Sequence, residues 1–482
     1  MRIQSLFLCS LISILLNGQL FAEYEELVVS AKKIESVTYW VDDFSVFSLS
    51  SEDIKKLDPQ HPKQIFTRIP GIWISRGSGQ EHLTAIRSPV LTGPGACGSF
   101  LILENGIPIR PSGFCNVNGL FEANSEVAGK IEVIKGPASS LYGANAMHGL
   151  INIISPELSA PNTLSSNIGP NGYKNIKISL GDYENWKINS HIASNDGFRE
   201  DSGFEQQKLH TSKLIYLSSW KGKINFYFNN LNQETAGYIY GEEAYKREEI
   251  YLLNSNPEAY RDAKSLRINI QLYKKNDTSL YTVSPYIRKN KMEFLQHYLP
   301  GSPLENNNHW SLGVLVKRIQ TLSKLDIITG GQIEFADVEL KEFQPHPLTS
   351  SSPFNNAVRP QGFHYNYQVN SQSISFFSGF DDFLISKIFK AFGDFRFENL
   401  SYSYDNKMLS GNTRDNGIPC SFGGCFYSRP RDRRDNFNEA SFRLGIVSEP
   451  KQVSFFSQIS SGFRPPQVNE LYRLQKKQKV TD

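Results

Sequence analysis

The feature that most constrains this chain is a period-two alternation of apolar and polar residues, which recurs many times after about residue 160. Clear examples are residues 224–229, 332–340 and 394–400. Successive side chains of a strand point to opposite faces, so this period predicts β-strands with two unlike faces. The runs approach the roughly 9–11 residues with which a tilted strand crosses a bilayer. A soluble β-sandwich remains an alternative, because the membrane-strand signal is weak in any one segment.

Composition narrows the possible fold and function classes. Aromatic residues make up 12% of the 482 residues, with 32 Phe and 22 Tyr, which suits a protein built from strands. Beyond the N-terminus no segment reaches the roughly 20 apolar residues of a membrane helix, so a membrane protein of this sequence must cross as a closed barrel. The formal charge of +3 gives no field that would attract nucleic acid.

The N-terminus predicts an export signal. Arg2 precedes an apolar stretch at residues 6–16, and the segment ends on the small residue Ala22 before acidic Glu23. This order of charge, apolar core and small residue is typical of a cleaved signal peptide, which we place at residues 1–22. A buried helix is the alternative interpretation.

The cysteines agree with export. Of five cysteines one, Cys9, lies in the signal segment, and the others form the local pairs Cys97 with Cys115 and Cys420 with Cys425. An even number in close pairs predicts disulfides formed in an oxidising compartment. A metal site is the alternative, but neither pair has the Cys-x-x-Cys spacing and no His lies near either. We therefore expect no metal site and no cofactor.

Residues 50–157 predict a small α+β domain. A serine-capped helix starts at residues 51–54, and a second helical segment follows Pro62 and ends at Pro70-Gly71. The dipeptide Asn105-Gly106 predicts a tight hairpin. The remaining predicted elements are strands at residues 72–74, 100–103, 131–134 and 150–154, with a turn at residues 139–143.

Three stretches of this domain resemble the plug domain of TonB-dependent outer-membrane receptors. They are residues 64–72, which contain Pro70-Gly71; residues 101–108, around Asn105-Gly106; and residues 131–137 followed by 141–143 and 149–153. Their order and spacing are those of the family. Residues 462–472 are similar to a further motif found inside such barrels, with Pro465 in place of the usual Ala, and part of this motif also occurs in haem receptors.

The resemblance implies a domain order. Residues 1–22 are the signal peptide, and residues 23–49 form a periplasmic linker that carries the TonB box at Glu26, Leu27, Val28, Val29, Ser30 and Ala31. Residues 50–157 are the plug, and residues 158–482 form an antiparallel transmembrane β-barrel. About 13 or 14 strands fit into that length, whereas family barrels have about 22. We therefore expect the chain to be a fragment.

The resemblance also implies a function without covalent chemistry. Such receptors lie in the outer membrane of Gram-negative bacteria, surrounded by lipid, and take up scarce ligands using the energy-transducing protein TonB as partner. A ferric siderophore is the expected ligand, and haem, cobalamin and oligosaccharides remain open. No Gly-x-Ser-x-Gly, His-Glu-x-x-His or phosphate-binding loop indicates an enzyme. A surface adhesin is the alternative from another class, although it would need neither TonB box nor plug.

Overall fold

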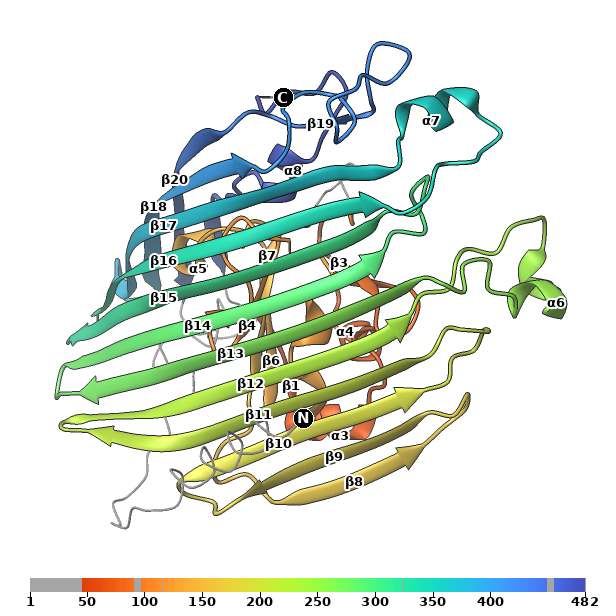
Figure 1. Cartoon of the computed structure of the whole chain (residues 1–482). Helices are drawn as coiled ribbons and strands as arrows, with labels where there is room; N and C mark the ends of the chain where they lie inside the picture. The colour runs from red at the N-terminus through yellow and green to blue at the C-terminus, as the bar shows by residue number, and fades with distance from the viewer. Residues whose placement is uncertain (1–45, 91–96, 116, 324, 449–454, 482) are drawn as a thin grey trace.

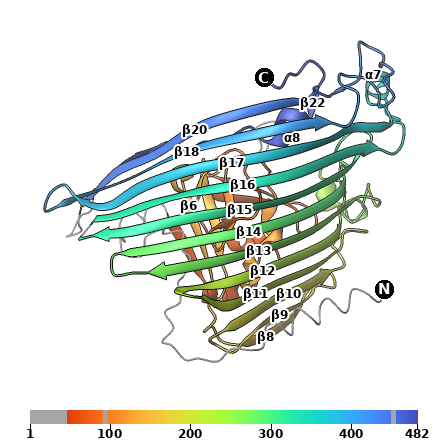
Figure 2. The ribbon, with the colours of Figure 1, turned by 60° about the vertical axis from the view of Figure 1, so that its left-hand side comes forward.

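The computed structural model describes residues 46–90, 97–115, 117–323, 325–448 and 455–481. It has two parts, a small α+β domain and a large curved sheet. Figures 1 and 2 show the small domain, in red to yellow, on the concave side of the sheet. The TonB box and the signal peptide lie outside the described residues.

The small domain is built on a five-stranded sheet with the strand order β1-β6-β7-β4-β5. Strand β4 runs parallel to β7, and the other neighbours are antiparallel. Strands β2 and β3 form a separate hairpin. Buried apolar side chains such as Ile65, Phe66, Ile102 and Ile131 form one core between this sheet and the helices. The elements are β1 (Val46–Ser50), α3 (Ser51–Leu57), α4 (Pro62–Phe66), β2 (Ile72–Arg76), β3 (His82–Ile86), β4 (Leu101–Glu104), β5 (Ile107–Pro108), η1 (Gly119–Glu122), η2 (Ser125–Val127), β6 (Lys130–Lys135), α5 (Ser139–Tyr142) and β7 (Gly149–Ile154).

The structure differs from the sequence-based expectations in several details of this domain. Helix α4 ends at Phe66, before the expected Pro70-Gly71, and β3 is a strand that the sequence patterns did not predict. The capping residue of α3 is Ser50, whose hydroxyl accepts from the amide of Asp53, so the cap lies one residue before Ser51. Residues 139–142 form the short helix α5 where we expected a turn. Strand β1 pairs with β6 and begins at Val46, within the segment expected to be linker.

The large sheet contains 13 strands in one antiparallel meander, in agreement with the expected plug followed by a barrel-type sheet. The alternating runs at residues 224–229, 332–340 and 394–400 lie inside β12, β16 and β18, respectively. The strands are β8 (Thr163–Ile168), β9 (Lys174–Gly181), β10 (Trp186–Asn195), β11 (Phe204–Leu217), β12 (Trp220–Glu234), β13 (Tyr260–Lys275), β14 (Ser279–Leu295), β15 (Leu304–Leu322), β16 (Leu325–Gln344), β17 (Gly362–Leu384), β18 (Phe389–Asn406), β20 (Arg433–Ser448) and β21 (Phe456–Ser460).

The outer face of this sheet carries a belt of exposed apolar side chains. Phe335 of β16 lies opposite Leu312 of β15, and on neighbouring strands Phe376 lies opposite Phe397. All four are exposed although they are large and apolar. Directly paired apolar residues across many strands are what a lipid-facing barrel wall requires, because lipid replaces water around them.

The inner face is polar and buried instead. Lys208, Arg267, Arg288 and Arg396 project inward and are each 5% exposed or less. Charged residues are almost never buried unless they are paired. Lys208 and Arg267 pair with Glu126 and Glu104 of the small domain, whereas Arg288 and Arg396 pair with Glu334 and Glu398 of the sheet. A polar interior with an apolar exterior is the reverse of a soluble sandwich and matches an outer-membrane barrel.

The two ends of the sheet differ in their connections. One end has short turns, as between β11 and β12, and the other has long loops that carry the short elements η3 (Ala244–Lys246), α6 (Glu248–Tyr251), α7 (Pro353–Val358), β19 (Tyr427–Ser428), α8 (Val468–Tyr472) and β22 (Leu474–Gln475). Figure 1 shows α6 and α7 at this looped end. We expected residues 473–479 to be a polar loop, but β22 within them pairs with β19. Among the described residues no helix is long and apolar enough to span a membrane.

Candidate functional site: the interface between plug and sheet

Ion pairs join the small domain to the inner face of the sheet. Glu126 of η2 accepts from Lys208 Nζ of β11, with both carboxylate oxygens at 2.9 Å. Glu104 of β4 accepts from Arg267 Nη2 of β13 at 2.6 Å. Glu126, Lys208 and Glu104 are almost fully buried. Removing one partner of such a pair leaves a buried charge without compensation, which costs about 3–5 kcal/mol.

Glu122 extends this network toward the looped end. Its carboxylate accepts from Arg110 of the same domain and, at 2.6 Å, from Asn290 Nδ2 of β14. Arg267 also donates to the Glu122 carbonyl at 2.9 Å. Both carboxylate oxygens and the carbonyl of Glu122 therefore have a donor, and the small domain is fixed against β13 and β14 by charge and hydrogen bonds together.

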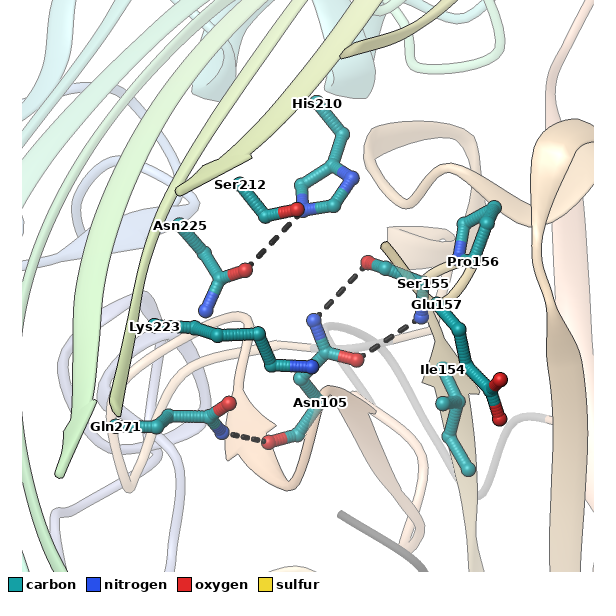
Figure 3. A pocket seen from close by; sticks show the side chains of 10 residues that line it. All are labelled: Asn105, Ile154, Ser155, Pro156, Glu157, His210, Ser212, Lys223, Asn225 and Gln271. Carbon is teal, nitrogen blue, oxygen red and sulfur yellow. Dashed lines mark hydrogen bonds between the residues drawn. The ribbon is translucent and has the colours of Figure 1, made fainter. Parts of the chain in front are cut away.

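At the end of the sheet with short turns, the hairpin between β4 and β5 contacts the wall. Asn105 has a left-handed φ of 48°, which the tight turn requires. Its side-chain amide donates to Ser155 Oγ at 3.0 Å, and Gln271 Nε2 of β13 donates to its carbonyl at 2.7 Å. Figure 3 shows these groups around a small polar cavity, which is lined by Asn105, Ile154, Ser155, Pro156, Glu157, His210, Ser212, Lys223, Asn225 and Gln271.

At the opposite end lie residues 97–100 and 108–115, on either side of the hairpin between β4 and β5, which we together name the disulfide loop. The structure joins Cys97 to Cys115, and it also joins Cys420 to Cys425 within the long connection between β18 and β20. Arg288 of β14 donates to the Pro108 carbonyl at 2.7 Å, and Glu334 of β16 accepts from the Ser112 amide at 3.1 Å. The disulfide loop is thus attached to both its own domain and the wall.

Two buried histidines lie in the core of the small domain. Burial lowers the pKa of His61 to about 2, and the nearby His82 and Arg76 lower it further. Burial likewise lowers the pKa of His82 to about 4, and Lys208, Arg261 and Arg110 contribute to the decrease. His82 Nε2 accepts from the Leu120 amide at 3.2 Å, and its Nδ1 lies 3.0 Å from the Gln80 carbonyl. Both contacts suit a neutral imidazole.

The predicted site residues are only partly placed. Glu26 to Ala31 lie outside the described residues, so the TonB box stays a prediction. Among the residues that the structure describes, no group of His, Cys, Asp and Glu could hold a metal ion. Sequence reasoning missed the ion pairs, although single charges inside alternating runs, such as Lys208 and Arg267, are a signal for an inward-facing charge.

Comparisons with known proteins identify the small domain and the fold of the chain. Residues 43–150 match the model of the TonB-dependent receptor plug domain. The siderophore receptor PiuA from Acinetobacter baumannii is 13% identical with a TM-score of 0.65, over 88% of this chain and 67% of that one. The ferric yersiniabactin uptake receptor FyuA from Yersinia pestis is 12% identical with a TM-score of 0.64, over 87% and 65%.

A further match is the ferric-catecholate import receptor Fiu from Escherichia coli, 16% identical with a TM-score of 0.63, over 88% of this chain and 70% of that one. The chain thus spans about two thirds of the length of these structures. The three solved structures are each described as a receptor. The chain therefore carries a TonB-dependent receptor plug domain at residues 43–150 and shares the fold of these receptors.

Proposed function

We propose that this receptor imports a ferric siderophore by TonB-dependent displacement of its plug. The siderophore binds at the looped end of the sheet, above the disulfide loop. Binding makes the segment Glu26 to Ala31 available in the periplasm, where TonB pairs with it by strand addition and draws on the proton-motive force.

The position of the plug carries this proposal, because it lies inside the curve of the sheet and is held there mainly by polar bonds. When such an interface opens, water can replace its hydrogen bonds and ion pairs. Opening an apolar interface would instead expose apolar surface to water, which is unfavourable in proportion to the area exposed. The choice of ligand is supported by the three relatives above, whose names describe a siderophore receptor, a ferric yersiniabactin receptor and a ferric-catecholate receptor.

The test is uptake of radioiron from a panel of ferric catecholates and carboxylates by cells that produce the receptor. The variant Val28→Pro removes one backbone donor and fixes φ, so it should disrupt strand addition to TonB. Uptake should fall to the level of cells without energised TonB, while binding at the cell surface is retained. Val28→Ile, which keeps the amide and the β-branched shape, is the matched control.

Two results would contradict this function. Unchanged uptake by Val28→Pro would reject the assignment of the TonB box. Uptake of haem or cobalamin with no uptake from any ferric siderophore would reject the ligand and leave the receptor class in place.

A further inference from the structure

A segment that follows β21 crosses the concave side of the sheet and contacts the plug. We name residues 462–473, which include α8, the strap. It corresponds to the barrel motif noted in the sequence, which the function proposed above does not use. Its contacts fall on two regions of the plug and on two regions of the wall.

The first plug region surrounds α5. Ser139 Oγ accepts from the Phe463 amide at 3.1 Å and donates to the Phe463 carbonyl at 3.3 Å. Gln467 Nε2 donates to Asn145 Oδ1 at 2.9 Å. A Cβ at Gly462 would lie 2.9 Å from Met147 Cα and 3.0 Å from the Met147 carbonyl oxygen. The strap backbone thus packs directly on the plug backbone at a position where only glycine fits.

The second plug region is the disulfide loop. The Val468 amide donates to the Gly113 carbonyl at 3.0 Å, and Glu470 Oε1 accepts from the Cys97 amide at 3.3 Å. Arg464 fixes the Glu470 carboxylate with bonds of 2.7 and 3.1 Å. Glu470 Oε2 also accepts from the Gln467 amide at 3.1 Å and so closes the capping box of α8. One carboxylate therefore shapes the strap and bonds to the end of the disulfide loop.

The far end of the strap is bound to the inner face of the sheet, to β18 and β20 through Tyr472 and to β15 and β16 through Arg473. Tyr472 donates to Asp435 of β20 at 2.8 Å and stacks on Tyr404 of β18. Arg473 forms ion pairs with Glu305 of β15 at 2.7 Å and with Glu342 of β16. The near end follows Ser461, whose amide donates to the Phe442 carbonyl of β20 at 2.8 Å. Because both ends are fixed to the sheet, the strap can resist movement of the plug segments beneath it.

We propose that the strap positions the disulfide loop and the α5 region in the closed plug, with Glu470 as the positioning residue. This inference rests on the proposed function, since it assumes a plug that opens. The plug bonds of the strap are hydrogen bonds with, at most, one charged partner. The contacts of the plug with β11 and β13 are instead buried ion pairs, and separating these before water has entered leaves uncompensated buried charges. The strap side is therefore the side that opens first.

The experiment measures leakage through the receptor without ligand and without energised TonB. The probe is vancomycin, which general porins exclude by size. Glu470→Ala removes the acceptor used by the Cys97 amide, and Gly462→Ala pushes the strap away from Met147. Each should lower the inhibitory concentration of vancomycin about tenfold, the change given by a shift of roughly 1.4 kcal/mol in the equilibrium between closed and open plug. Glu470→Gln keeps a neutral acceptor and should lie between Glu470→Ala and the wild type.

Gln478→Ala is the control, because its side chain bonds to the Gln475 amide and lies beyond the strap. The amount of folded receptor in the membrane is measured on gels, from the band whose migration changes when the sample is heated. If a strap variant inserts poorly, Ser139→Ala replaces it, since this change deletes the plug side of the same contact and leaves the strap sequence intact.

Normal amounts of receptor with unchanged vancomycin resistance in Glu470→Ala, Gly462→Ala and Ser139→Ala would overturn the proposal. Equal leakage in Gln478→Ala would also overturn it. The leakage assay uses neither ligand nor TonB. Leakage in the strap variants would therefore support the role of the strap even if no siderophore is taken up. Conversely, siderophore uptake would not support that role if the strap variants do not leak.

Discussion

At the scale of single residues, this molecule depends on charges that have no contact with bulk water. Glu126 and Lys208 come from the plug and from β11, and both are almost fully buried. The desolvation of each ion is offset only while the other is present. The pair therefore fixes the position of the plug in the wall more than it raises total stability, and its removal has different effects depending on whether one or both partners are lost.

This asymmetry gives the first prediction. Lys208→Ala should destabilise the folded receptor by about 3–5 kcal/mol, because it leaves Glu126 charged and buried. Adding Glu126→Gln to Lys208→Ala should recover a large part of the loss, because the amide is neutral. Chemical unfolding of the purified receptor measures both. Lys246→Ala breaks an exposed pair with Glu243 and should change stability by less than about 1 kcal/mol. A loss as small in Lys208→Ala as in Lys246→Ala would contradict the role of the buried pair.

The second prediction concerns pH and His82. Burial holds its pKa near 4, below the value of about 6.5 expected in the unfolded chain. The unfolded state therefore binds the proton more readily, so the stability from neutral His82 is complete above pH 6.5 and falls as the pH decreases toward 4. Between pH 6.5 and 5 the loss should be on the order of 2 kcal/mol. Hydrogen exchange of the plug core measures it.

His82→Gln provides the comparison for that experiment. Glutamine keeps a donor and an acceptor but does not titrate, so the variant should start less stable and lose less stability between pH 6.5 and 5. The same slope in wild type and variant would assign the pH dependence to other groups, with His61 as the next to test because burial lowers its pKa even more.

At the scale of elements, the disulfide loop is the clearest case of a segment held from several sides. Cys97 and Cys115 close a loop with a sequence separation of 18, which corresponds to about 3 kcal/mol in the chain-entropy model. Cys420 and Cys425 are separated by 5 residues, and the same model gives about 2 kcal/mol. The double variant Cys97→Ser, Cys115→Ser should therefore lower stability more than Cys420→Ser, Cys425→Ser. Non-reducing peptide mapping establishes both pairings first, and free thiols in exported protein would contradict them.

Strand β16 illustrates what could be predicted from the sequence and what could not. Alternation is a local property, so the strand itself was predictable over residues 332–340. Its orientation was not, because the apolar phase changes within it: Ile333 and Phe335 face outward, whereas Val338 and Leu340 are buried on the inner side. The cause is outside the strand. The first part belongs to the exposed apolar belt, and an inner cluster with Tyr365, Tyr402 and Tyr472 contacts the second.

The plug was predictable from local signals, since Asn105-Gly106 forms the expected hairpin between β4 and β5. The interface between plug and sheet was not. Lys208 and Glu126 lie 82 residues apart in the chain, and Arg473 lies 131 residues from Glu342. Sequence periodicity does not link such distant positions, because the two charges of a pair meet only after the sheet has folded around the plug. The pairing of Leu474 and Gln475 in β22 with β19 could not be predicted for the same reason, because the two strands are distant in the sequence.

At the scale of the whole molecule, the outer surface has a boundary that the last prediction can test. On the outer face of β16, Ile333 and Phe335 continue the apolar belt, whereas Asp337, Glu339 and Lys341 follow on the same face. The same change occurs on β18, where Phe395 and Phe397 precede Asn399 and Ser401. We take this line as the upper limit of the hydrocarbon layer, because a bilayer accepts charge only near its interfaces.

The last prediction compares two positions on either side of this line. Phe335→Arg places a cation in the belt and should cost about 2–4 kcal/mol if the residue lies near the bilayer midplane, and less toward the interface. Glu339→Arg puts the same side chain four residues further along the same face, where polar neighbours such as Gln368 lie opposite, and should cost less than about 1 kcal/mol. Both are measured by the heat-modifiable fraction recovered from outer membranes and by urea unfolding in lipid vesicles.

Equal costs would place both residues in one environment and move the boundary away from residue 336. A cost for Glu339→Arg alone would reverse the assignment of the belt. Because both variants add the same side chain to one strand, a difference between them reports the depth of the membrane and not the loss of a particular contact.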